Sequence, residues 1–232
     1  MIKLYGFGKH MGMVDPSPFV LKVDAFLRMA GLPYEMVTRT DNLKNAPKKK
    51  LPYIEYDGLQ VADSYFILRE LTHHYGVTLD DHLSEEQASQ FELMSRAIDE
   101  SLYWSLVYSR WILEEPWQVV KQTFFGALPA PLKWFVPNMI RKDVIKTLHR
   151  QGTGRHTKEE ILLMADRVFS SLSVILGDKS YFSGERVCSF DATAYGMLAE
   201  FISCELDNEF NQLARKYENL VLFCQRVEQE LY

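Results

Sequence analysis

The start of the chain predicts two short strands with a helix between them. Residues 2–5 predict a short strand, because apolar and polar side chains alternate along them, and residues 34–38 predict a second strand. Between them apolar side chains recur every three or four positions until Gly31 and Pro33, which mark the end of a helix. These apolar residues are Phe19, Val20, Val23, Phe26, Leu27 and Ala30. Strand, helix and strand of these lengths predict a parallel, right-handed βαβ unit.

The next segment predicts a hairpin and a second helix. A polar loop over residues 39–50 leads to two β-prone runs, residues 53–56 and 59–61. An Asp-Gly pair separates the two runs, which is a strong signal for a hairpin turn. A helix then opens at Asp63-Ser64. We therefore predict βαβ followed by ββα, in a first domain over residues 1–77.

Beyond residue 80 the alternation disappears and the pattern becomes helical. The sequence Ser84-Glu85-Glu86-Gln87 is a capping box that opens a long helix running toward Trp111. Further helices are predicted near residues 158–176, 191–206 and 217–230. Breaks are expected at Pro116, Pro129, Pro131, Pro137 and residues 151–154. The fold class is therefore α/β followed by all-α, with an all-helical second domain over residues 83–232.

Composition and charge narrow the class of protein. Hydrophobic residues make up 47% and charged residues 25% of the 232 positions, which is typical of a globular chain. The net charge of −5 disfavours nucleic-acid binding, which needs a basic surface. No apolar run approaches the roughly 20 residues that span a bilayer, and no signal peptide is recognisable. We expect a cytoplasmic protein without membrane insertion or a nucleic-acid partner.

The cysteines and histidines give no metal-binding pattern. Cys188, Cys204 and Cys224 are widely spaced, form no CxxC pair and have no histidine at ligand spacing. His73 and His74 are adjacent, so they point to different sides of a helix. We expect no metal and no disulfide framework, and we interpret the cysteines as core residues.

Ser17-Pro18 begins the first predicted helix. Serine is a preferred helix N-cap, and proline is favoured at the first helical position. A helix N-terminus also offers free N–H groups and a positive dipole, which stabilise an anion. The pair is thus either a good cap alone or a cap whose hydroxyl also donates to an anionic ligand such as a thiolate.

Two further dipeptides are candidate ligand contacts, and Asp63-Ser64 is expected near Ser17, because both helices of this fold begin at one end of the sheet. Leu51-Pro52 opens a strand, and its peptide bond is either trans or cis, with its neighbouring amide and carbonyl open to a ligand. Asp63-Ser64 caps the second helix; the serine suits a carboxylate and the aspartate an ammonium group. Lys50 ends a run of three lysines that either assists a carboxylate or is only a solvated face.

This arrangement resembles the glutathione transferase superfamily. The stretch from Ser17 falls where thioredoxin-like proteins carry Cys-Pro-x-x, and Leu51-Pro52 matches the cis-proline of the family. Asp63-Ser64 matches the acidic-Ser pair that binds the γ-glutamyl end of glutathione. The resemblance covers essentially the whole chain and implies a thioredoxin-like first domain followed by a helical one.

Within the superfamily the chain is most similar to the failed-axon-connections and metaxin-like branch. Many members of this branch have cysteine where this chain has Val20, so thiol chemistry from that position is excluded. The capping Ser/Thr of the superfamily's late core helix is replaced by Cys188, and we expect Asp191 still to support that helix. The supporting stretches are residues 17–22, 26–31, 151–156, 178–184 and 191–193.

The resemblance implies a transferase of the detoxification type, with glutathione as co-substrate and no metal. Ser17 is the expected stabiliser of the glutathione thiolate, and Tyr5 is the rival because several classes use a tyrosine at the end of the first strand. The partner substrate is an apolar electrophile. Glutathione would be bound by Lys50, Leu51, Pro52, Asp63 and Ser64.

Some questions stay open at this stage. The aromatic-rich residues 101–136 suit a cleft for the electrophile, but equally an ordinary core or a dimer interface. Family habit implies a homodimer. The alternative function is a non-catalytic binding or adaptor protein, as some relatives of this branch are. A role in metaxin-like membrane import is disfavoured by the missing membrane segment.

Overall fold

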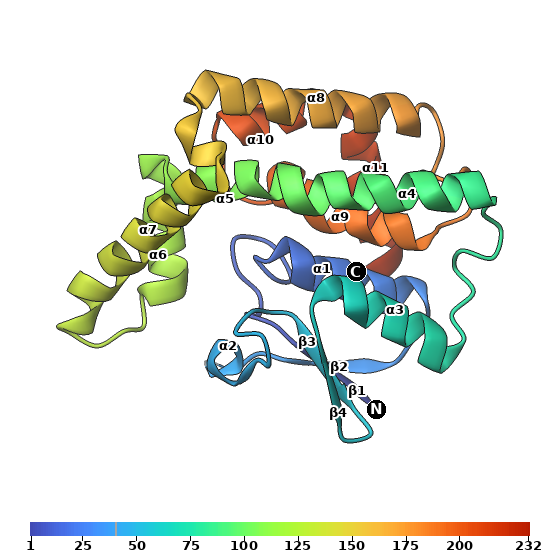
Figure 1. Cartoon of the computed structure of the whole chain (residues 1–232), viewed down its shortest axis with the longest axis horizontal. Helices are drawn as coiled ribbons and strands as arrows, with labels where there is room; N and C mark the ends of the chain where they lie inside the picture. The colour runs from blue at the N-terminus through green and yellow to red at the C-terminus, as the bar shows by residue number, and fades with distance from the viewer. Residues whose placement is uncertain (40) are drawn as a thin grey trace.

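The first domain has the predicted order of strands and helices. The structure is a computed structural model that describes residues 1–39 and 41–232; Thr40, inside the predicted polar loop, lies outside the described residues. Figure 1 shows this domain, in blue and teal, below the layers of helices. Its elements are β1 (Ile2–Tyr5), α1 (Pro18–Met29), β2 (Tyr34–Val37), α2 (Asn42–Asn45), β3 (Tyr53–Tyr56), β4 (Leu59–Ala62) and α3 (Ser64–Tyr75).

The strands form a sheet in the order β2-β1-β3-β4. β1 pairs parallel with β2, Ile2 opposite Tyr34, and β3 runs antiparallel to both β1 and β4. Asp57 (φ 49°) and Gly58 (φ 78°) are both left-handed, which is the backbone that a tight hairpin requires. The predicted βαβ–ββα order is confirmed, with the short helix α2 added before β3.

The second part of the chain is built from helices joined by loops. Its capping box is confirmed, because the Ser84 side chain accepts from Gln87 N and the Gln87 side chain from Ser84 N. The helices are α4 (Glu85–Ala97), η1 (Ile98–Leu102), α5 (Tyr103–Trp111), α6 (Glu114–Phe125), α7 (Leu132–Gln151), η2 (Thr153–Arg155), α8 (Lys158–Leu176), α9 (Ser189–Ile202), α10 (Glu209–Ala214) and α11 (Glu218–Leu231).

The central helix α9 joins the two parts by packing directly on α1 (Figure 1). Every residue of α9 from Phe190 to Ile202 is buried. The close approach depends on Gly196, where an added Cβ would lie 2.6 Å from Pro18 O and 2.7 Å from Lys22 N. The N-terminus of α1 is therefore held against the helical core.

Asp191 supports the start of α9, as expected. Its carboxylate accepts from the backbone N–H of Cys188 (2.8 Å) and of Phe182 (2.9 Å). It is fully buried, and this burial raises the pKa of Asp191 to about 6. The three cysteines are buried and unpaired, in agreement with their interpretation as core residues.

Several predicted boundaries are wrong. Pro116 is the third residue of α6, a position whose N–H would have no acceptor within the helix, so the N–H that proline lacks is not missed and no break occurs. Pro137 lies inside α7, which continues past it at the cost of one main-chain hydrogen bond. The expected helix over 191–206 ends at Ile202, and a separate helix, α10, follows. The breaks at Pro129 and Pro131 and at residues 151–154 are confirmed.

Candidate functional site

One cavity of about 390 Å³ collects the candidate residues. It lies where α1 and α3 begin, facing η1 and the start of α5. Six of the seven residues singled out in the sequence line it: Ser17, Lys50, Leu51, Pro52, Asp63 and Ser64. The structure thus brings together segments that are far apart in the sequence.

Ser17 is placed as the N-cap of α1. Its Oγ accepts a hydrogen bond of 3.4 Å from Val20 N. Within the described chain no acceptor takes the hydroxyl proton, so this proton remains available to a ligand in the cavity. Ser17 N and Val20 N already donate and Pro18 has no N–H, so the Phe19 N–H and the dipole are what the start of α1 adds to this hydroxyl. The site can therefore stabilise an anion such as a thiolate.

Asp15 holds the loop that carries Ser17. Its Oδ2 accepts from Phe7 N (2.6 Å) and Gly8 N (2.9 Å), and its Oδ1 accepts from Ser17 N (3.0 Å). The side chain is fully buried, and burial, opposed by these three bonds, raises the pKa of Asp15 from 3.8 to about 7. Both ends of the loop between β1 and α1 are thereby tied to one carboxyl group.

A second tie reaches the same loop from the helical domain. Arg110 Nη1, on α5, donates to Pro16 O at 2.7 Å. The same guanidinium pairs with Glu200 on α9, and both side chains are almost completely buried. The pair is made by Arg110 Nη2 and Glu200 Oε2, while Arg110 Nε and Glu200 Oε1 have no hydrogen-bond partner in the described chain, so each charge depends on the other. The position of Ser17 is therefore determined by α5 and α9 as well as by its own domain.

The start of α3 forms the opposite side of the cavity. Asp63 caps the helix by accepting from Tyr65 N at 3.1 Å, while its backbone N–H reaches Pro52 O at 3.4 Å. The Leu51-Pro52 bond is cis. Lys48 Nζ lies 3.9 Å from Asp63 Oδ2, and both side chains are about half exposed. This side combines backbone N–H groups, a carboxylate and the amine of Lys50, which suits a zwitterionic head group.

Aromatic side chains line the rest of the cavity. The ring of Phe19 packs on Tyr103 at 4.8 Å, and Phe7 and Trp104 extend this surface. The π-helical turn η1 carries Asp99 into the cavity wall, paired with Lys22 at 2.6 Å. An apolar molecule bound beside Ser17 would contact these rings.

The aromatic residues of segment 101–136, for which a cleft, a core and a dimer interface were considered, lie in different environments. Tyr103 and Trp104 line the cavity, so they belong to a cleft. Trp117 is 2% exposed and belongs to the core. Trp134 and Phe135 are 67% and 69% exposed and have no part in either.

Tyr5 does not line the cavity. Its hydroxyl donates to Glu55 Oε2 at 3.3 Å, and its ring stacks on Tyr53 at 4.1 Å. Burial, followed by the charge of Glu55, raises the pKa of Tyr5. The structure therefore separates the two expected thiolate stabilisers, and only Ser17 faces the other site residues.

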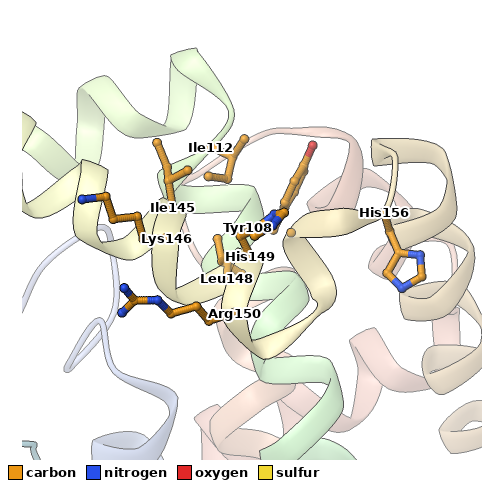
Figure 2. Close-up of a pocket in the computed structure, with 9 residues that line it drawn as sticks. Tyr108, Ile112, Ile145, Lys146, Leu148, His149, Arg150 and His156 are labelled. Atoms are coloured by element: carbon orange, nitrogen blue, oxygen red, sulfur yellow. The ribbon is translucent and has the colours of Figure 1, made fainter.

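Another hollow, of about 450 Å³, lies between α5, α7 and η2 (Figure 2). It is lined by Tyr108, Ile112 and residues of α7 and η2, and none of the candidate site residues contributes to it. Across residues 1–39 and 41–232 no group of three His, Cys, Asp or Glu side chains is placed to hold a metal ion. No helix in the same ranges is long and apolar enough to span a membrane.

Comparison with known proteins agrees with this geometry. The glutathione S-transferase N-terminal domain matches residues 18–116, and the glutathione S-transferase C-terminal domain matches residues 165–227. Among solved structures, a beta-etherase from Sphingobium sp. strain SYK-6 shares the fold with a TM-score of 0.63 at 16% identity, covering 98% of this chain and 94% of the other.

Three curated relatives represent different parts of the superfamily. The isoprene-epoxide–glutathione S-transferase of Rhodococcus sp. (strain AD45) is 33% identical over 85% of this chain and 85% of its own length. Human metaxin-2 is 27% identical over 91% of this chain and 81% of its own length. Failed axon connections of Drosophila melanogaster is 27% identical over all of this chain and 58% of its own length. With both domains matched and the cavity at their junction, the chain belongs to the glutathione S-transferase superfamily, with relatives in its metaxin-like branch.

Proposed function

We propose that the protein is a glutathione transferase that joins the sulfur of reduced glutathione to an apolar electrophile. The observation that carries this proposal is the available hydroxyl proton of Ser17 at the N-terminus of α1. That hydroxyl shares one cavity with Lys50, Leu51, Pro52, Asp63 and Ser64. The similarity to a glutathione S-transferase at 33% identity supports it independently.

The proposed orientation of glutathione follows the charges around the cavity. Ser64 and the first N–H groups of α3 bind the γ-glutamyl carboxylate, and Asp63 receives the ammonium group. The backbone of Leu51 pairs with the cysteinyl residue, and Lys50 approaches a carboxylate. In this orientation the sulfur lies beside Ser17.

Ser17 promotes the reaction by stabilising the thiolate. A free cysteine-like thiol has a pKa of about 8.5, and only the thiolate is a good nucleophile. Lowering this pKa by about two units requires roughly 2.7 kcal/mol of preferential stabilisation. A hydrogen bond from Ser17 and the dipole of α1 are together of that size. The thiol proton passes to solvent, and the sulfur forms the new bond to carbon.

The aromatic wall determines the class of electrophile. Phe7, Phe19 and Trp104 offer an apolar surface beside the proposed sulfur position. An epoxide is the first class to test, because one relative is named for isoprene epoxide. With an epoxide the C–S bond forms as a C–O bond of the ring breaks, and the alkoxide takes a proton from water.

Calorimetric titration of reduced glutathione, followed by turnover with an epoxide, tests the proposal. We expect saturable binding to the wild type and loss of most turnover in Ser17→Ala, with an unchanged fold. Ser203→Ala, a serine outside the cavity, is the control and should retain turnover. No binding at millimolar glutathione would overturn the proposal, and unchanged turnover in Ser17→Ala would exclude Ser17 as the stabiliser.

A second candidate function is a binding or adaptor protein without turnover. The observation that favours it is the similarity to metaxin-2 over 91% of this chain. Glutathione binding without turnover across a panel of epoxides and other electrophiles would select this candidate. The cytoplasmic location expected from the sequence stays a prediction.

We also propose a homodimer. Support comes from three exposed apolar side chains of β4, α3 and α4, which are Leu59, Phe66 and Leu93. Leu93 is the most exposed of the three, at 72%, and a second subunit would cover it. Sedimentation equilibrium of the wild type and of Leu93→Glu tests this, and a monomeric wild type would contradict it.

A further inference from the structure

One face of α7 changes character along its length. Positions three and four apart share a helix face, and one such series begins at the N-terminus of α7. All six of its residues are exposed. The first three are apolar and the last three are basic: Leu132, Phe135, Met139, Lys142, Lys146 and Arg150. Figure 2 shows Lys146 and Arg150 reaching together to one side of α7, away from Tyr108 and His156.

The apolar half places several large exposed side chains close together. Phe135 and Met139 are 69% and 63% exposed, and the neighbouring Trp134 is 67% exposed. These side chains lie at the end of α7 nearest the loop to α6. Figure 1 shows α6 and α7 extending away from the other helices, so the loop forms the tip of a projecting hairpin. We call residues 114–151 the α6–α7 hairpin.

The charge of this hairpin opposes that of the whole protein. Residues 114–151 contain six Lys or Arg and three acidic residues, Glu114, Glu115 and Asp143, a net charge of +3 in a chain whose total is −5. Only Arg141 of these basic residues pairs with an acid in the described chain, with Glu114 at 2.9 Å. Lys142, Lys146 and Arg150 therefore remain available to an external anion.

The order of apolar and basic residues along α7 matches the order of apolar and charged layers at a lipid surface. At about 1.5 Å per residue, Lys142 and Arg150 lie roughly 5 and 16 Å beyond Met139 along the helix axis. An apolar tip inserted about 5–10 Å into the interface would therefore place the basic side chains among the headgroups and just above them. Tryptophan is also enriched at this depth in membrane proteins.

We propose that the α6–α7 hairpin docks this protein on an anionic lipid bilayer, tip first, without crossing it. The charge complementarity of the basic residues favours anionic headgroups, each contributing a gain of a few-fold in affinity. The glutathione cavity lies between α1, α3 and η1, so docking leaves its residues outside the contact. The proposal stands whether or not the protein is a transferase.

Vesicle flotation of the full chain tests this proposal. The probes are vesicles of phosphatidylcholine alone and vesicles in which about a third of the lipid is phosphatidylglycerol. We expect binding to the anionic vesicles, weakened by salt, and little binding to the neutral ones. The triple variant Lys142→Gln, Lys146→Gln, Arg150→Gln should bind at least roughly tenfold more weakly. The double variant Phe135→Ser, Met139→Ser should lose binding to a similar extent.

Matched controls change equally exposed residues elsewhere. Leu163→Ser with Val174→Ser removes apolar side chains of α8 that are 61% and 79% exposed. Lys3→Gln, Arg167→Gln, Arg186→Gln removes three exposed basic residues outside the hairpin. Both controls should bind anionic vesicles like the wild type. The proposal would be overturned if the wild type did not bind anionic vesicles at low salt, or if the controls lost binding to the same extent. It would also be overturned if the wild type were a dimer that only the variant Phe135→Ser, Met139→Ser dissociates.

Discussion

The loop that carries Ser17 and the α6–α7 hairpin are held by opposite means. The loop is tied by Asp15 and by the Arg110–Glu200 pair, all buried, and α1 behind it touches α9 at Gly196. In the hairpin, α7 has only two buried residues, Pro137 and Leu148. The position of Ser17 is thus fixed by buried polar contacts, and water cannot replace them. The surface that we propose to dock on a bilayer has exposed side chains instead.

The largest expected effect comes from breaking the buried pair. Arg110→Met leaves the charge of Glu200 buried without a partner, and we expect a loss of about 3–5 kcal/mol in the free energy of unfolding. Urea denaturation measures it. The double variant Arg110→Met, Glu200→Met removes both charges and should recover most of the loss. Equal stability of the wild type and Arg110→Met would show that the pair has no part in holding the loop.

The next effect depends on pH, because Asp15 has a raised pKa of about 7 in the folded protein. The unfolded chain, with a value of 3.8, holds fewer protons between these values, so the wild type loses stability as pH rises from about 4 to about 7. Asp15→Asn cannot ionise, and its stability relative to the wild type should therefore rise by a few kcal/mol across this range.

Thermal denaturation of both proteins from pH 4 to pH 8 provides the measurement. Asp57→Asn, at a carboxylate whose side chain is 70% exposed, is the control and should keep the wild-type profile. A constant difference between Asp15→Asn and the wild type over the range would contradict the prediction.

Gly196→Ala tests the contact between α1 and α9, and its expected effect is smaller. The added methyl group would meet the backbone of Pro18 and Lys22 at less than 3 Å, so one helix must move. We expect a loss of about 1–3 kcal/mol in the free energy of unfolding, with weaker glutathione binding because α1 carries Ser17. Calorimetry of glutathione binding beside urea denaturation separates the two effects. Full stability would mean that the helices are less tightly packed than this contact implies.

The smallest effect on stability is expected in the hairpin. Phe135→Ser and Met139→Ser change side chains that already contact water, so each should alter the free energy of unfolding by about 0.5 kcal/mol or less. Urea denaturation of these variants, with Phe125→Ser as a buried comparison on α6, measures this difference. A loss above 2 kcal/mol in the exposed variants would mean that the hairpin is covered in solution.

Local sequence signals were enough to predict the elements whose ends are marked by turn or capping residues. Asp57-Gly58 predicted the hairpin and Ser84 the start of α4, because a left-handed turn and an orphan helix terminus each require particular residues nearby. The same logic failed at Pro137, where a helix continued through a residue that usually ends one. It also gave no sign of the π-helical turn η1, whose position depends on what packs around it.

The sequence by itself determined the βαβ–ββα order of the first domain apart from α2, the capped starts of α1 and α3, and six residues that line one cavity. These depend on neighbouring residues or on the topology that a βαβ–ββα order imposes. Only the tertiary structure decided that Asp15, Arg110 and Glu200 position Ser17, that Tyr5 lies outside the cavity, and that α7 is exposed. Their roles come from contacts between residues as many as 94 positions apart, and no local pattern records which distant side chain a buried charge will meet.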